Sequence, residues 1–230
     1  MKKILGTTIV LLGAAALSAT AATVQIELSG YDSGRNVNSS FEDYRNDLSA
    51  MANHLNEWLA NSSGWCGSIA NPSSDHIDCF KSAVGDEDGS VTVTYTNRAG
   101  YGGSGVGLKV SLDAAGDYSA DAFSSLTFTV DLATSTGGTY RVYLAYQTEN
   151  GWQAVESQAG SGTITVTADL SGNKLTSENV YVFVESNGGR GNDSIFTASM
   201  TGELASVPEP ATASLGLLGL AALMVRRRRS

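Results

Sequence analysis

The chain has 230 residues and a formal net charge of −9, from 14 basic and 23 acidic residues. Only 16% of the residues are charged and 26 are glycines, as is typical of an exported β-rich protein. This acidic balance argues against nucleic acid and anionic lipid as partners of the protein body.

The N-terminus has the three parts of a secretory signal peptide. Lys2 and Lys3 precede an apolar stretch over residues 4–17, and Ala19-Thr20-Ala21 is an A-x-A cleavage pattern. We therefore expect residues 1–21 to be a signal peptide, cut after Ala21 or Ala22. The alternative is a first transmembrane anchor.

The next elements are a strand and the one predicted helix. Residues 24–28 alternate between apolar and polar side chains, which predicts a strand. Residues 41–60 are predicted to be helical, with a capping box made by Ser40 and Asp43. Apolar residues recur along it every three to four positions, at Tyr44, Leu48, Met51, Leu55 and Trp58 or Leu59. This amphipathic helix needs a surface to cover.

Cys66 and Cys79 are the only cysteines. In an exported protein such a pair predicts one disulfide. A catalytic thiol with His54 or His76 is the weaker alternative, because no flanking motif supports it. A zinc site would need more ligands than these.

Three consecutive acidic residues, Asp86, Glu87 and Asp88, lie between two glycines. Clustered carboxylates on a turn can hold Ca²⁺, which is the only cofactor that the sequence suggests. The run departs from the EF-hand pattern, and the alternative is a solvated turn.

The rest of the protein body is predicted to consist of consecutive β-strands. The glycine-rich residues 100–105 match a dinucleotide-binding pattern, but alternation follows where that motif needs a helix, so we interpret them as a hairpin connection. Alternation and turn residues predict strands at 91–95, 106–112, 126–132, 140–146, 152–155, 164–170, 180–184 and 195–204. We expect a mainly β, antiparallel sandwich over residues 22–204, jelly-roll-like.

Two of these strands carry aromatic side chains on the face opposite their core side. Tyr143 lies on one strand, and Tyr181 and Phe183 lie on the other. A large apolar face must be covered or must be a binding site. We expect the helix to cover it. The alternative is a sugar ring stacked on one of these three residues.

The C-terminus has three parts in a fixed order. Val207-Pro208-Glu209-Pro210 precedes an apolar run over residues 211–225, and Arg226, Arg227, Arg228 and Arg229 follow. Residues 205–230 resemble the PEP-CTERM sorting signal of Gram-negative bacteria. The resemblance implies export, a transmembrane helix, and processing near Pro208-Glu209-Pro210 by an exosortase, a membrane protease-transpeptidase. The alternative is a plain membrane anchor.

Processing would leave the body strongly anionic. Loss of the two N-terminal lysines and the four C-terminal arginines leaves 8 basic residues against 23 acidic ones, a net charge of −15 if Glu209 is retained.

No catalytic motif appears in the sequence: there is no nucleophile elbow, H-E-x-x-H or P-loop. The interpretation is a non-catalytic binding or structural module at the cell surface or in the extracellular matrix. Its partners would be the exosortase, the inner membrane before processing, and an extracellular polysaccharide. The alternative is a polysaccharide hydrolase that uses two of Glu149, Glu156, Glu178 and Glu185.

Overall fold

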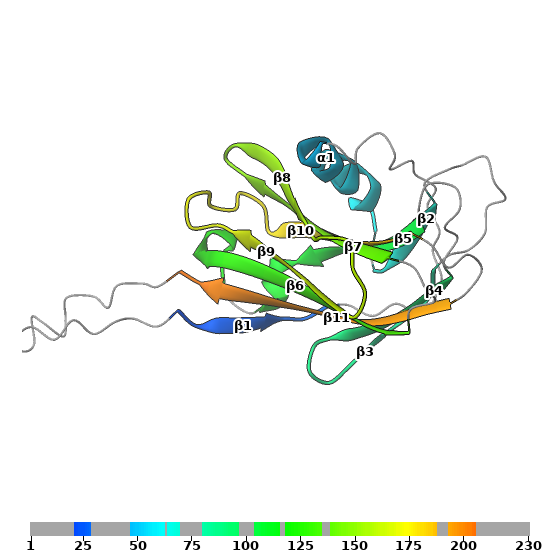
Figure 1. Cartoon of the computed structure of the whole chain (residues 1–230). Coiled ribbons are helices and arrows are strands. Elements are labelled where there is room, and N and C mark those ends of the chain that lie inside the picture. Colours follow the sequence, from blue (N-terminus) through cyan, green and yellow to red (C-terminus); the bar gives the residue numbers. More distant parts are fainter. Residues whose placement is uncertain are drawn as a thin grey trace, which may run out of the picture. The chain divides into compact units, whose positions relative to one another are not determined.

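Alternating apolar and polar residues build two antiparallel β-sheets in this computed structural model (Figure 1). The structure describes residues 21–28, 47–62, 64–69, 80–96, 104–115, 118–134, 139–187 and 193–205. Residues Ala22–Ala205 form one compact unit. The predicted antiparallel sandwich is confirmed at this level.

The first sheet, sheet A, has six strands. In order they are β3 (Phe80–Gly85), β4 (Val91–Thr96), β11 (Asp193–Leu204), β6 (Phe123–Thr134) and β9 (Thr163–Asp169). The sixth, β1 (Thr23–Ile26), pairs with residues 200–203 of β11, and β4 pairs with residues 193–198. Because β6 occupies the other edge of β11, β1 and β4 share one edge of that strand.

The second sheet, sheet B, has five strands. In order they are β2 (Cys66–Ile69), β5 (Ser104–Ser111), β10 (Asn179–Asn187), β7 (Thr139–Thr148) and β8 (Gly151–Glu156). Two short 3₁₀ helices, η2 (Leu112–Ala115) and η3 (Ala120–Ala122), link β5 to β6. All predicted strands are present, and β2 and β3 are additional to them.

The core lies between the inner faces of the two sheets. In β9 the apolar residues Ile164, Val166 and Ala168 are buried, whereas the alternate residues are exposed. The indole of Trp65, which precedes β2, packs edge-on against Phe196 of β11 with ring centroids 5.7 Å apart. Side chains from both sheets therefore meet in one apolar layer.

The described α-helix, α1 (Leu48–Leu59), begins later than the sequence predicts. Asp47 is extended, with φ −135°, and its carboxylate accepts hydrogen bonds from the N–H groups of Ser49 and Ala50. An N-cap at Asp47 rules out one continuous helix from residue 41, so that predicted start is wrong. The predicted capping residues Ser40 and Asp43 lie outside the described residues.

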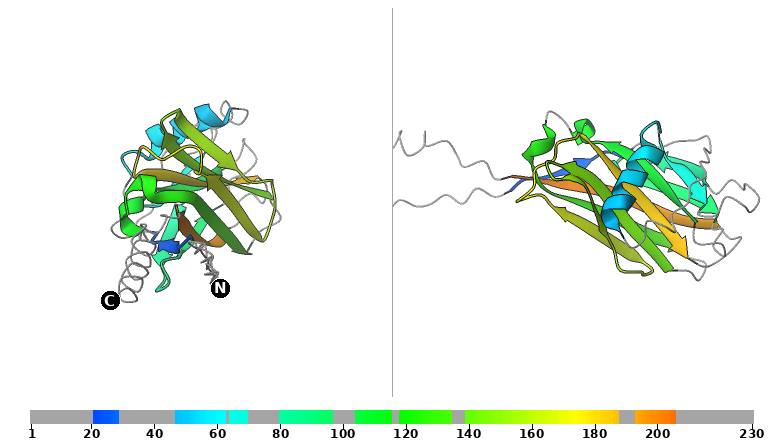
Figure 2. Two further views of the ribbon diagram at one scale, coloured as in Figure 1. Left: turned by 90° about the vertical axis from the view of Figure 1, so that its left-hand side faces the viewer. Right: turned by 90° about the horizontal axis from the view of Figure 1, so that it is seen from above.

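Helix α1 covers the outer face of sheet B (Figures 1 and 2). Its buried side chains pack on the aromatic residues of β7 and β10; they are Met51, Ala52, Leu55 and Leu59. A glycine on β5 makes room for them: a Cβ at Gly107 would lie 2.9 Å from the Trp58 ring and 3.0 Å from Leu59. The glycine is therefore part of the docking surface.

Three polar contacts fix α1 to three different strands. Ser49 Oγ donates to the Trp152 carbonyl of β8 at 3.2 Å. Tyr181 of β10 donates its hydroxyl proton to Asn56 Oδ1 at 2.9 Å. Lys109 Nζ of β5 donates to the carbonyl of Ala60 at 2.9 Å. A cation at this C-terminal end of the helix is also stabilised by the helix dipole.

No helix among the described residues is long and apolar enough to cross a bilayer. The predicted transmembrane segment at 211–225 lies outside them.

We predict that Phe183→Ala destabilises the protein by about 3–5 kcal/mol, because it leaves a cavity beneath α1. Phe183 is 1% exposed and its ring lies edge-on to Trp58, with centroids 5.6 Å apart. Denaturant unfolding measures the change. Val84→Ala is the matched control, since Val84 is 55% exposed. Equal stability of the Phe183 variant and wild type would contradict the docking of α1.

Candidate functional site

The aromatic face predicted from the sequence is closed. Tyr143, Tyr181 and Phe183 are 0%, 4% and 1% exposed beneath α1. Phe183 lies opposite Tyr143 in the β10–β7 ladder, and the Tyr181 ring contacts Trp152 at 5.4 Å between centroids. A sugar ring cannot stack on these three residues while α1 is in place.

A polar cluster continues this face beyond the aromatic residues. The Tyr143 hydroxyl donates to Glu185 Oε2 at 2.9 Å, and Glu185 is 5% exposed. Glu156 lies opposite Tyr143 on β8 and pairs with Arg141 at 3.5 Å. Burial, and then the negative charge of Glu185, raise the pKa of Tyr143 well above its usual 10.0.

Two of the four candidate glutamates therefore lie near one tyrosine. Glu149 and Glu178 lie outside the strands, in the connections beside β7 and β10. Of the near pair, Glu185 is buried and hydrogen-bonded, and Glu156 pairs with an arginine. The pair Glu185 and Glu156 therefore does not present two carboxylates to a substrate.

The outer face of sheet A is exposed on β9 and half-buried on β6 and β11, and it carries rows of hydroxyl groups. In the β6–β9 ladder Thr127 lies opposite Thr167, and Thr129 lies opposite Thr165. On the other side of β6, Thr201 and Ser199 of β11 lie opposite the same two residues. We call this surface the hydroxyl face; its residues are Thr92, Thr94, Thr127, Thr129, Thr163, Thr165, Thr167, Thr197, Ser199 and Thr201.

The hydroxyl groups of neighbouring strands lie at hydrogen-bonding distance. The Thr127 and Thr167 oxygens are 3.1 Å apart, and those of Thr129 and Thr165 are also 3.1 Å apart. Thr92 Oγ1 lies 3.3 Å from Thr197 Oγ1. Strands are about 4.8 Å apart and alternate residues about 6.8 Å apart, so the hydroxyls form a two-dimensional array.

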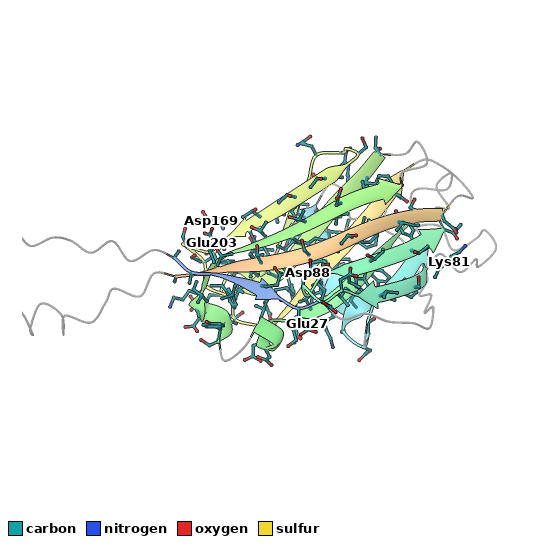
Figure 3. The ribbon with its side chains drawn as sticks, turned by 90° about the horizontal axis from the view of Figure 1, so that it is seen from below. Glu27, Lys81, Asp88, Asp169 and Glu203 are labelled. Carbon is teal, nitrogen blue, oxygen red and sulfur yellow. The ribbon has the colours of Figure 1, made fainter. Side chains whose placement is uncertain are left out.

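Charged side chains lie at both ends of this face and between them. Figure 3 views it from below, with Asp169 and Glu203 toward one end of the strands, Lys81 at the other, and Asp88 and Glu27 between them. Lys81 forms an ion pair with Asp193 at 2.8 Å. The outward side chains in the middle of β6, β9 and β11 are themselves neutral, apart from Asp131.

Asp86, Glu87 and Asp88 lie in the connection between β3 and β4, and the predicted cation site there stays a prediction. Asp88 Oδ1 accepts from the Ser90 hydroxyl at 2.6 Å, and Asp86 Oδ2 accepts from Thr92 at 3.2 Å. No group of three or more His, Cys, Asp or Glu residues that could hold a metal occurs in the described part of the chain. These hydrogen bonds stabilise the turn, as local Asp and Ser side chains commonly do.

The predicted disulfide stays a prediction. Cys66 is buried at the start of β2, and its sulfur lies 3.6 Å from Ser62 Oγ. Cys79 and His76 lie outside the described residues. His54 lies on α1, where partial burial lowers its pKa.

The residues of the sorting signal lie outside the described part of the chain, but a comparison with family models identifies them. The PEP-CTERM protein-sorting motif matches residues 206–229. The tail is therefore a PEP-CTERM sorting motif, as the sequence predicts. A comparison with curated proteins finds no match.

Several solved structures resemble the chain in part. The xylan-binding module CBM15 is 18% identical, with a TM-score of 0.36 over 63% of this chain and 93% of that module. The family 11 carbohydrate-binding module of cellulase Lic26A-Cel5E from Clostridium thermocellum is 14% identical, with a TM-score of 0.30 over 54% and 79% of the two chains. The CBM22-1 xylan-binding domain from Paenibacillus barcinonensis Xyn10C is 13% identical, with a TM-score of 0.33 over 63% and 87%.

We predict that stability falls as pH rises above about 10, the usual pKa of tyrosine. The pKa of Tyr143 is higher in the folded than in the unfolded protein. Its contribution to the free energy of unfolding is therefore complete below the pKa of the unfolded state, and it is lost as the pH rises through the pKa of the folded state. Unfolding in denaturant between pH 8 and pH 11 measures this, and Tyr143→Phe should show a shallower decline. Parallel declines for the two proteins would contradict the assignment.

Proposed function

We propose that this is an exported protein of the cell surface or extracellular matrix, delivered through its sorting motif by an exosortase. Its body is a non-catalytic binding module on a jelly-roll-like sandwich. The PEP-CTERM match at residues 206–229 supports the export route. Lys2 and Lys3, with Ala19-Thr20-Ala21, supply the matching N-terminal signal.

The ligand that best fits the hydroxyl face is an uncharged extracellular polysaccharide. The observation that carries this proposal is the register of the hydroxyls on β6, β9 and β11, such as Thr165, Thr129 and Ser199 in one row. Hydroxyls both donate and accept, as sugar hydroxyls do, and threonine methyl groups can contact the apolar faces of sugar rings. The acidic residues at one end of the face, Asp169 and Glu203, disfavour an anionic polymer.

The carboxylates support a binding role over hydrolysis. A glycosidase needs two carboxyl groups that flank the scissile bond. Here Glu185 is 5% exposed and Glu156 pairs with Arg141. Incubation with neutral polysaccharides should therefore release no reducing ends, and their release would favour the hydrolase alternative.

Processing at both ends is the first prediction from this proposal. Intact-mass spectrometry of the protein from its native host should detect neither the N-terminal lysines nor Arg226–Arg229. The physical reason is that both segments are signals read by membrane enzymes before the body is released. Mature surface protein that keeps its C-terminal arginines would instead be a plain membrane-anchored protein.

Retention by neutral polysaccharides is the second prediction. In affinity electrophoresis, gels containing neutral xylan or glucan should slow the processed protein, and gels containing anionic alginate should not. The double variant Thr127→Val, Thr129→Val should bind at least about fivefold more weakly, because each lost hydrogen bond is worth about 0.5–1.5 kcal/mol. Valine keeps the branched shape and strand preference of threonine, and water can replace the lost partner of the exposed Thr165 and Thr167, so the variant should stay folded.

The matched control is Thr176→Val, which removes an exposed hydroxyl outside the hydroxyl face. It should be retained like wild type. Equal retention of the double variant and this control, or stronger retention by alginate, would contradict the hydroxyl face as the ligand surface.

A further inference from the structure

Both ends of the folded body meet at one point of the sandwich. The N–H of Leu204 donates to the carbonyl of Ala22 at 2.8 Å, and Thr23 lies opposite Glu203 in the β1–β11 ladder. One residue further, the N–H of Ala205 donates to Ala122 of η3 at 2.7 Å. We call this end of the sandwich, formed by Ala22, η3 and Leu204–Ala205, the junction pole.

The sorting motif begins very close to this pole in the chain. Pro208 is only three residues beyond Ala205. Three residues span at most about 10 Å even when fully extended. An enzyme that acts at Pro208-Glu209-Pro210 must therefore approach the junction pole to within about that distance, unless the end of β11 comes apart.

An exposed aromatic side chain lies at this pole. Tyr118 is 38% exposed, and it and Val84 are the exposed large hydrophobic residues of the described part of the chain. The Tyr118 ring lies 6.4 Å from that of Phe123, and Phe123 pairs with Leu204. Tyr118 is thus separated by one side chain from the strand end that leads into the sorting motif.

We infer that the junction pole, together with the neighbouring Tyr118, is the surface on which the exosortase docks. This inference rests on the proposed function, since it assumes that an exosortase processes the tail. Tyrosine is enriched at protein interfaces because it buries a large area with little loss of conformational entropy. Docking there would keep the enzyme within reach of Pro208-Glu209-Pro210.

The charges at the pole favour a protein over the lipid surface as this partner. Asp121 of η3 and Glu203 of β11 are exposed, and Lys174 contacts Asp121 at 3.7 Å. Anionic lipid headgroups repel such acidic groups, whereas a protein surface can present basic groups to them.

Site-specific photocrosslinking of the full-length precursor tests this docking. A photoreactive phenylalanine derivative at position 118 should give a light-dependent adduct with the exosortase in a host that expresses it. The same probe at position 84 should not. Val84 is the matched control because it lies far from the junction pole. It pairs with Thr92, which in turn pairs with Thr197 of β11. Thr197 lies six residues before Glu203, which is about 20 Å at ~3.3 Å per residue. Adducts with lipid alone, equal adducts from both positions, or none would overturn the inference.

The rate of precursor conversion supplies a second readout. In pulse–chase experiments Tyr118→Ser should slow conversion about threefold or more, and Val84→Ser should leave it unchanged. With a ten-residue Gly/Ser insertion after Ala205, the wild-type and Tyr118→Ser precursors should be converted at equal rates. The enzyme can then reach the cleavage site without docking on the junction pole. Thermal unfolding midpoints check that both serine variants are folded. Conversion of Tyr118→Ser at the wild-type rate without the insertion would overturn the docking, whereas no conversion of wild type at all would overturn the proposed function itself.

Discussion

The packing of one helix on one sheet face determines which surfaces of this protein are open. Sheet B carries tyrosine and phenylalanine on its outer side, which water would solvate poorly. Helix α1 covers them with its apolar side chains and is fixed by contacts to β8, β10 and β5. Gly107 lets the helix approach, because a side chain there would meet Trp58 and Leu59. Without this docking the protein would expose a broad aromatic patch.

The two outer faces therefore differ in chemistry and in exposure. The face beneath α1 is apolar and closed, and it ends in a buried tyrosine–glutamate hydrogen bond. The opposite face of the molecule has alternating threonines that point away from the same core, as in β9. Burying apolar residues on one side of each strand thus leaves hydroxyls on the other side of sheet A, where we propose that a polar, uncharged ligand binds.

The sequence predicts most of the strands because apolar and polar residues alternate regularly along them. It misses β3 because a register shift between Phe80 and Ser82 breaks the alternation, so that Phe80 and Ala83 are both buried. It misses β2 because a four-residue strand that contains Gly67 has no clear period. The helix start is misplaced because the apolar spacing continues past Asp47, where only the backbone geometry reveals the cap.

The hydroxyl face could be predicted only in part. The threonines of each strand alternate visibly in the sequence, but the neighbours of Thr127 are Thr167 and Thr201, far along the chain. This register depends on the order of strands in the sheet, which no local pattern contains. The sorting motif could be identified in full, because its three parts are contiguous and each has its own physical signature.

We propose that sheet A, rather than the helix-covered sheet B, binds the ligand. Chemical-shift mapping of the processed protein with a soluble fragment of a retained neutral polysaccharide tests it most directly. We predict that the largest shifts occur at the methyl groups of the outward threonines on β6, β9 and β11, with Tyr143, Phe183 and α1 unchanged. Shifts centred on Tyr181, Trp152 and α1 would contradict the account and place the ligand on sheet B.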